Sequence, residues 1–180
     1  MGNYKNEYLK TEVLNNTLVC ISTILNENNI NNWFIGYGTL LGIIRNNSCI
    51  DGDDDVDIVI DKTNYNIVKD LLIKKGFEFE YKYANIGNSK DILKIKTSEQ
   101  YCTVDFYMAS VDGKGNFNDK WEKTIWSNCY DDNNKLIEYI WNDNKLYLPF
   151  NYEQKLINRY GENWRIPQKS KGVTPRKLIL

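Results

Sequence analysis

Residues 51–61 place six carboxylates within eleven residues and then continue into an apolar, β-branched segment. Carboxylates this close repel one another, and burying them without a counter-ion is costly. A β-strand that starts in such a run therefore indicates a cation bound at its end. We expect a divalent-metal site suited to phosphoryl-type chemistry, built on the end of a strand.

Alternation along that strand selects two of the carboxylates. Asp55 and Asp57 lie on one face, about 6–7 Å apart along the strand, and Asp53 points the same way, while the apolar residues between them face the core. Two carboxylates at this spacing can converge on one or two Mg²⁺ ions, which prefer oxygen ligands. Asp105 is the predicted third ligand, because it lies within an apolar segment where a carboxylate requires a partner.

The acidic run has two other interpretations. A solvated turn before the strand remains the alternative for the other four acids, at positions 51, 53, 54 and 61. An EF-hand calcium loop is excluded, because Val56 stands where that loop requires glycine and Lys62 where it requires glutamate.

Composition narrows the chemistry further. The chain has no histidine, so a general base must be Asp, Glu, Lys, Tyr or Cys. A net charge of −1 argues against a nucleic-acid partner. The four cysteines show no paired spacing and are expected to be buried free thiols in a reducing compartment. No segment resembles a signal peptide or a membrane span, which predicts a cytoplasmic location.

Hydrophobic periodicity predicts one mixed α/β domain over residues 1–180. Apolar spacing predicts helices at residues 7–29, 39–45, 64–75 and 151–160. It predicts strands at residues 33–35, 54–61, 77–83, 92–96 and 101–108, and a hairpin from 136–141 and 145–148. Residues 112–119 are expected to form a glycine-bearing loop.

The sequence also offers candidate phosphate-binding residues. Gly38 and Thr39 lie between a predicted strand and a predicted helix, where backbone N–H groups can face an anion. Arg45, at the far end of that helix, is either an ordinary surface cation or a phosphate clamp. Lys94 and Lys96 share one face of a strand, where solvated lysines are also common.

Three ordered motifs resemble the LicD/fukutin family. The first is Gly-Thr-Leu-Leu-Gly-Ile-Ile-Arg at 38–45, followed by the acidic run at 53–58. The second is Val-Asp-Phe at 104–106, and the third is Tyr-Gly-Glu-Asn-Trp-Arg-Ile-Pro at 160–167. The resemblance spans about residues 33–167. Two positions depart from it: Gly52 stands where relatives often have Trp, and Asn46 where they usually have His.

The resemblance implies a nucleotidyltransferase-like fold, with a mixed sheet flanked by helices. It also implies a Mg²⁺- or Mn²⁺-dependent transfer of a phospho-alcohol group, such as phosphocholine or ribitol phosphate, from a CDP-linked donor to a sugar or glycan. Asp55 and Asp57 would hold the metal, Asp105 would complete the site or accept the proton of the acceptor hydroxyl, and Gly38 with Thr39 would form the donor-phosphate turn. Arg45 and Lys94 or Lys96 would balance the phosphates.

Two further functions fit the same residues. A nucleotidyltransferase that moves NMP from an NTP to a small molecule or protein would use the same acidic triad and glycine turn. A non-catalytic nucleotide- or glycan-binding module would keep the fold without the reaction. The sequence leaves the donor alcohol, the acceptor and the oligomeric state open.

Overall fold

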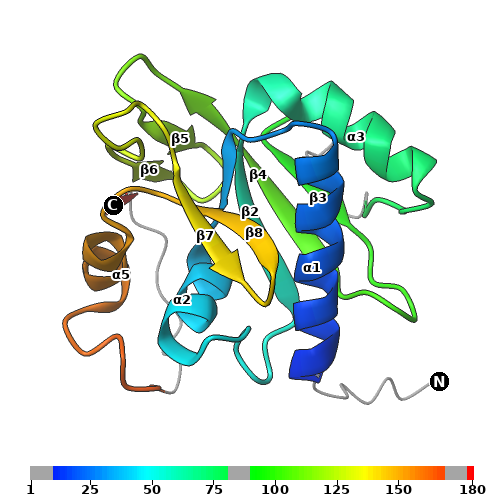
Figure 1. Cartoon of the computed structure of the whole chain (residues 1–180), viewed down its shortest axis with the longest axis horizontal. Coiled ribbons are helices and arrows are strands. Elements are labelled where there is room, and N and C mark those ends of the chain that lie inside the picture. The colour runs from blue at the N-terminus through cyan, green and yellow to red at the C-terminus, as the bar shows by residue number, and fades with distance from the viewer. Residues whose placement is uncertain (1–9, 81–89, 169–177) are drawn as a thin grey trace.

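A mixed seven-stranded sheet forms the centre of the molecule (Figure 1). The computed structural model of the chain describes residues 10–80, 90–168 and 178–180. The strand order is β1-β2-β4-β5-β6-β9, and β3 also pairs with β4. Strands β2 and β4 are parallel, as are β6 and β9, and the other pairs are antiparallel. The strands are β1 (Trp33–Ile35), β2 (Asp55–Asp61), β3 (Ile92–Ile95), β4 (Thr103–Val111), β5 (Phe117–Asp119), β6 (Thr124–Trp126) and β9 (Leu178–Ile179).

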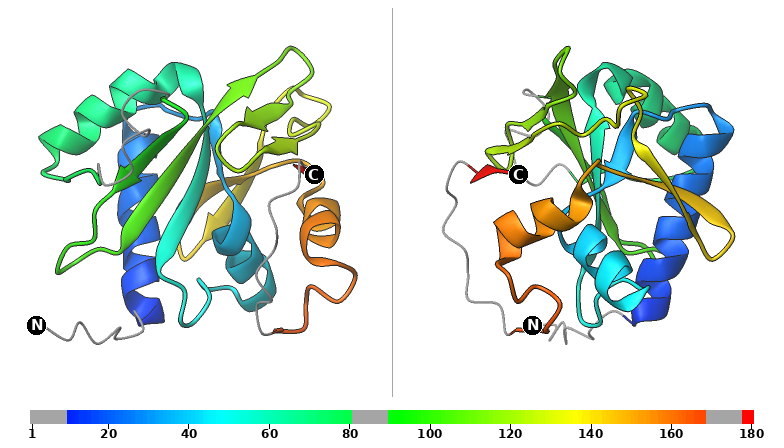
Figure 2. Two further views of the ribbon diagram at one scale, coloured as in Figure 1. Left: turned by 180° about the vertical axis from the view of Figure 1, so that it is seen from behind. Right: turned by 60° about the vertical axis from the view of Figure 1, so that its left-hand side comes forward.

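Helices and a separate hairpin surround this sheet. Helix α1 lies along one side of the sheet, and α5 lies on the opposite side (Figure 2). The hairpin packs against β1 and α1. The predicted fold class, a mixed sheet flanked by helices, is confirmed. The helices are α1 (Thr11–Glu27), α2 (Tyr37–Asn46), η1 (Lys62–Asn64), α3 (Tyr65–Lys74) and α5 (Tyr152–Tyr160), and the hairpin consists of β7 (Ile137–Trp141) and β8 (Asn144–Leu148).

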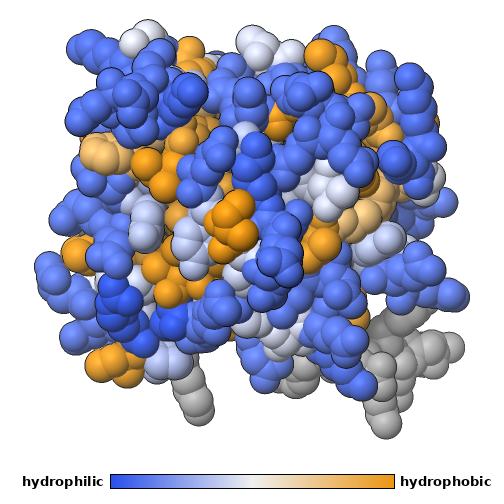
Figure 3. Space-filling view, in the orientation of Figure 1, coloured by the Kyte–Doolittle hydropathy of each residue, from blue (hydrophilic) through white to orange (hydrophobic). Residues whose placement is uncertain are grey.

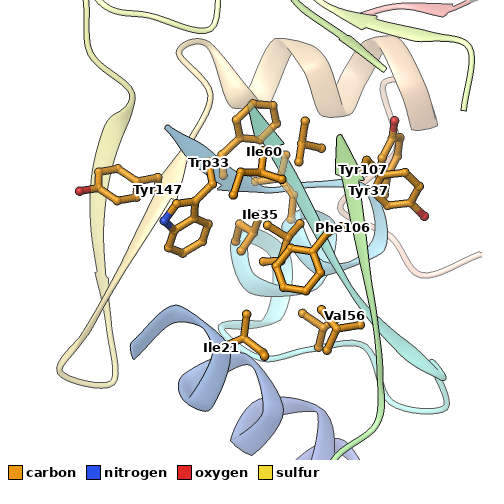
Figure 4. Packing of buried hydrophobic residues seen from close by; sticks show 14 of the residues in the cluster. Ile21, Trp33, Ile35, Tyr37, Val56, Ile60, Phe106, Tyr107 and Tyr147 are labelled. Atoms are coloured by element: carbon orange, nitrogen blue, oxygen red, sulfur yellow. The ribbon is translucent and has the colours of Figure 1, made fainter. Parts of the chain in front are cut away.

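The apolar face of α1 covers one face of the sheet and leaves the carboxylates on the other. Leu14, Leu18 and Ile21 recur at helical spacing and are fully buried. Figure 4 shows Ile21 on the same side as Val56 and Phe106. Since side chains alternate along a strand, Asp55, Asp57 and Asp105 must point to the opposite face.

Most predicted elements are present, and the differences lie in short segments. The predicted loop at 112–119 contains β5, because Phe117 and Asp119 turn inward on either side of exposed Asn118. Helix α2 begins at Tyr37, two residues earlier than expected, so Gly38 and Thr39 belong to its first turn. In place of the strand expected from residue 77, only an isolated bridge joins Phe79 to β3, and residues 81–83 lie outside the described part.

Polar side chains dominate the surface seen from one side, and most of the cysteine thiols are buried. Hydrophilic side chains cover most of the face seen in Figure 3. The exposed large apolar residues are spread over α1, α3, β7, β9 and the segment after α5. All four cysteines are free, as predicted; three are buried and Cys20 is half-buried. Within the described residues, no helix is long and apolar enough to cross a bilayer.

Gly42, within α2, allows the loop at 48–50 to approach the helix backbone. A Cβ at this position would lie 2.7 Å from the Ser48 carbonyl oxygen and 2.9 Å from the Ile50 nitrogen. Because these are backbone atoms, they can move away only if the loop that leads to the acidic run also moves. The packing of the loop at 48–50 against α2 therefore requires glycine at position 42.

We predict that Gly42→Ala lowers the free energy of unfolding by about 2–3 kcal/mol, as overpacking in a tight contact does. Gly113→Ala is the matched control, because a Cβ there meets no atom within 4 Å and the residue has no positive φ. Urea titration of both variants measures the difference. Equal midpoints for the two variants would contradict the prediction.

Candidate active site

The parallel pairing of β2 with β4 brings the three predicted ligands together. Asp57 and Asp105 are register partners on the two strands, and Asp55 stands opposite Thr103. Asp57 is only 5% exposed and Asp105 only 6%, while Asp55 is half-buried. The carboxylate face of the sheet is therefore covered, and Asp57 is not the surface-side residue that strand alternation alone suggests.

The Asp57 carboxylate is held by the start of α2 and by β4. Its Oδ2 accepts hydrogen bonds from the backbone N–H groups of Gly38 at 2.9 Å and Thr39 at 3.4 Å. Its Oδ1 accepts one from the Tyr107 hydroxyl at 3.1 Å. In return, the Asp57 N–H donates to the Thr39 hydroxyl at 2.8 Å. The two amides predicted to face a donor phosphate thus point into the acidic cluster.

Asp53 and Asp54, which precede β2, lie close to Asp55. Carboxylate oxygens of Asp53, Asp54 and Asp55 lie within 4.8 Å of one another. A Cβ on Gly38 would lie 2.9 Å from Asp53 Oδ2, so the Asp53 side chain also approaches the glycine turn. Asp54 itself is exposed, which agrees with the solvated interpretation of that residue. Asp53 therefore joins the site from the side of the turn.

Burial and mutual repulsion raise the pKa values of the carboxylates in this cluster. Burial raises the pKa of Asp57 well above its ordinary value, and the charges of Asp55 and Asp105 raise it further. Burial, followed by the charge of Asp105, raises the pKa of Asp55 to about 7. Burial also raises the pKa of Asp53 and of Asp105, and Lys94 opposes the shift at Asp105. A bound cation would stabilise the charged form of these carboxylates, because it offsets their mutual repulsion.

The donor set fits a hard divalent cation. Lys94 Nζ lies 2.8 Å from Asp105 Oδ1 and 3.0 Å from Oδ2, but its orientation gives a hydrogen bond to Oδ2 only. Asp105 Oδ1 is buried and accepts no hydrogen bond from the described residues. Buried carboxylates with raised pKa values offer the oxygen ligands that Mg²⁺ or Mn²⁺ prefers, and Lys94 neutralises only one of them. A metal site at Asp55, Asp57 and Asp105 stays a prediction, because among the described residues the three carboxylates that lie within 4.8 Å of one another are those of Asp53, Asp54 and Asp55.

The predicted basic residues occupy three different environments. Lys94 forms the ion pair with Asp105 and so faces the site. Lys96 pairs with Glu78 at 3.3 Å on the exposed surface. Arg45 lies at the opposite end of α2 from Gly38, where one nitrogen donates to the Trp164 carbonyl oxygen at 3.4 Å. A role for Arg45 or Lys96 toward a phosphate remains a prediction.

Sequence reasoning did not single out an aromatic layer beside the turn. Tyr37 has a left-handed backbone, with φ of 43°, at the point where the chain enters α2. Its ring packs edge-on against Tyr107, with the centroids 4.7 Å apart, as Figure 4 also shows. Its hydroxyl donates to Asp119 Oδ2 and accepts from the Trp126 indole N–H. The only available signal was a tyrosine between two glycines, which many loops contain.

Asp119 anchors this layer from within β5. It is fully buried, and its Oδ1 accepts hydrogen bonds from the backbone N–H groups of Trp121 and Glu122 at 2.9 and 3.1 Å. Burial raises the pKa of Asp119 to about 6, although the Tyr37 hydrogen bond opposes that shift. The Asp119 carboxylate thus holds Tyr37 in place, and the Tyr37 hydroxyl donates a hydrogen bond to the buried Asp119 Oδ2.

We therefore predict that Tyr37→Phe costs about 1–3 kcal/mol of stability, the usual cost of leaving a buried acceptor unsatisfied. The loss is expected to be smaller at about pH 5 than at about pH 7.5, because the raised pKa lets Asp119 take up a proton in the folded state below about pH 6. Thermal unfolding at the two pH values measures it. Tyr139→Phe, which removes a half-buried hydroxyl with no partner among the described residues, is the control.

Comparison with known proteins places this site in a family. The model of the LicD/FKTN/FKRP nucleotidyltransferase domain matches residues 30–155, a span that contains the glycine turn, the acidic strand and Asp105. The chain belongs to the LicD/FKTN/FKRP family. Family and fold together support a transferase. None of the curated proteins matches the chain at a significant level.

Solved structures share the fold of this LicD-family chain at low sequence identity. The lincomycin-bound crystal structure of LnuA, a lincosamide antibiotic adenylyltransferase, is 16% identical with a TM-score of 0.56, over 80% of this chain and 85% of that chain. A proposed nucleotidyltransferase from Thermotoga maritima is 15% identical with a TM-score of 0.45, over 89% of this chain and 92% of that chain. The LnuA match supports the nucleotidyltransferase-like fold.

Proposed function

We propose that this LicD-family chain is a Mg²⁺- or Mn²⁺-dependent transferase that moves a phospho-alcohol group from a CDP-linked donor to a sugar or glycan hydroxyl. The observation that carries the proposal is the convergence of Asp55, Asp57 and Asp105 on one covered face of β2 and β4, beside the amides of the α2 turn. Family membership supports the reaction class.

The transfer exchanges one P–O bond for another. An acceptor hydroxyl oxygen attacks the phosphorus that carries the alcohol, the bond from that phosphorus to the bridging oxygen breaks, and CMP leaves with the bridging oxygen. A divalent ion, when bound, neutralises charge on the donor diphosphate. The hydroxyl proton passes to a carboxylate, because the chain has no histidine. Asp105 suits either that role or metal binding, since its buried carboxylate lies on the strand next to Asp55 and Asp57.

The remaining residues would position the donor. The turn at Gly38 and Thr39 directs two backbone N–H groups at the site, and in the protein alone Asp57 accepts from both. A phosphate oxygen that approached these amides would replace the carboxylate as acceptor. Lys94 holds Asp105 through an ion pair and so limits the repulsion among the acids.

The competing reaction is nucleotidyl transfer. Both reactions need the same carboxylates and turn, and a shared fold does not separate them. The deciding experiment incubates the protein with Mn²⁺, a panel of sugars and either CDP-choline, CDP-ribitol or radiolabelled NTPs. A phospho-alcohol on the sugar together with released CMP supports the proposal. A labelled nucleotide on the acceptor together with released pyrophosphate overturns it in favour of nucleotidyl transfer.

A non-catalytic module is tested by calorimetry on the same protein. The proposal expects nucleotide binding that depends on Mn²⁺, because the carboxylates need the ion before they can tolerate a diphosphate. Nucleotide binding of equal affinity with and without Mn²⁺, or none at all, would favour the module.

A further inference from the structure

The last turn of α5 brings an arginine to the aromatic layer beside the glycine turn. The Arg159 guanidinium carbon lies 4.4 Å from the centroid of the Tyr37 ring and 5.7 Å from that of Tyr160. A guanidinium that lies against an aromatic ring keeps its N–H edges available for acceptors. Arg159 therefore lies against Tyr37, the residue that directly precedes Gly38.

Tyr37 and Tyr107 link this arginine to the acidic cluster. Tyr37 packs on Tyr107, and the Tyr107 hydroxyl donates to Asp57. The pKa of the neighbouring Tyr160 is raised mainly by burial and also by the charges of Asp57 and Asp53, and Arg159 lowers it. The end of α5 is thus within range of the carboxylates, although it lies about a hundred residues further along the chain.

Arg159 differs from the other described arginines in the groups that its guanidinium contacts. Within the described ranges it forms no ion pair with a carboxylate, and it lies near the Tyr160 ring as well as the Tyr37 ring. Arg165, by contrast, pairs with Glu153 at 2.7 Å on the exposed surface. Arg45 reaches only a backbone carbonyl, at the far end of α2. Arg159 is half-buried and permanently charged, and none of the described carboxylates is paired with it.

We propose that Arg159 is a substrate-binding residue that contacts the diphosphate of a nucleoside-diphosphate donor. The inference rests on the proposed function, and it adds a donor contact outside the matched span of residues 30–155. A diphosphate placed between the carboxylate-bound ion and Arg159 has a cation on each side, and the turn amides provide further donors. Arginine suits this role because its planar fork of N–H groups matches phosphate oxygens.

The test compares Arg159→Gln and Arg159→Lys with Arg165→Gln. Arg165 is the matched control because its guanidinium also stacks, 4.2 Å from the Trp164 ring, but it is already paired with Glu153. Calorimetry with wild type and each variant measures Mn²⁺ alone, then CDP and CMP with Mn²⁺ present. Circular dichroism and thermal unfolding establish that each variant is folded.

We expect Arg159→Gln to weaken CDP binding by about 10- to 100-fold, the usual effect of losing a charge-assisted hydrogen bond. CMP, which lacks the second phosphate, should lose less affinity, and binding of Mn²⁺ alone should stay within about twofold. Arg159→Lys keeps the charge but not the planar fork, so its CDP affinity should fall between wild type and Arg159→Gln. Arg165→Gln should bind CDP as wild type does.

Two results would overturn the inference. Wild-type CDP affinity in Arg159→Gln would show that the arginine makes no phosphate contact. An equal loss of CDP, CMP and Mn²⁺ binding would show that it acts only on the structure of the site, and Arg159→Lys decides the matter if the glutamine variant does not fold. CDP binding is measured without turnover, so the two proposals can fail separately. If the protein transfers no group from a CDP-alcohol but Arg159→Gln still weakens CDP binding, the proposed reaction is refuted and the donor contact is retained.

Discussion

Asp57→Asn is expected to lower transfer from a CDP-alcohol by at least about a thousandfold, a loss of about 4 kcal/mol of transition-state stabilisation. The asparagine keeps the shape of the side chain but removes the charge that a divalent ion needs. Its oxygen can still accept from the Gly38 N–H, and its amide can donate to the Tyr107 hydroxyl, so the turn should stay in place.

The fold of this variant should therefore survive. Replacing a buried, repelled carboxylate by a neutral amide removes a desolvation cost, so the thermal midpoint should be unchanged or higher. Asp51→Asn is the control, because Asp51 is in the same acidic run but exposed. Initial rates at saturating donor and Mn²⁺ measure the effect. Turnover of Asp57→Asn close to that of Asp51→Asn would refute the metal assignment.

Asp55→Asn is expected to make the metal-free protein more stable while it abolishes stabilisation by Mn²⁺. The folded-state pKa of Asp55 is about 7 against an ordinary value of 3.8, so the folded protein binds this proton more tightly than the unfolded chain does. Stability then falls as the pH rises from about 4 to about 7, and the full cost is present above about pH 7. The asparagine removes that cost.

The gain should be about 1–2 kcal/mol near pH 7.5, which corresponds to a rise in Tm of about 2–8 °C for a chain of this size. Near pH 4 the variant and wild type should unfold at similar temperatures, because Asp55 is then protonated in the folded state. Scanning calorimetry with and without Mn²⁺ measures both effects, since a ligand that binds only the folded state raises its Tm. A variant that Mn²⁺ still stabilises as strongly as wild type would remove Asp55 from the ligand set.

The local signals in this chain were strong enough to predict most long elements and the position of the acids. Strand alternation placed Asp55 and Asp57 on one face, and the apolar surroundings of Asp105 marked it as a carboxylate in need of a partner. The structure brings all three to adjacent strands. The short strands β5, β6 and β9 were missed, because two or three residues contain too little periodicity to distinguish a strand from a loop.

Contacts between distant segments were beyond the reach of such signals. Tyr37 depends on Asp119, which lies within a segment expected to be a loop. Arg159 reaches the site only because α5 packs beside the start of α2. Periodicity cannot detect the contact of Tyr37 with Asp119 or with Arg159, since each is created by the packing of elements far apart in the sequence.

Local sequence patterns are enough to predict a strand that begins in repelling carboxylates, and to predict which two of them share a face, because side-chain alternation is a local property of the backbone. Local patterns do not predict that Asp57 is buried and bonded to the α2 turn, or that Arg159 from α5 lies against Tyr37. Burial and pairing depend on which elements pack together. That choice comes from the whole core and not from any one segment.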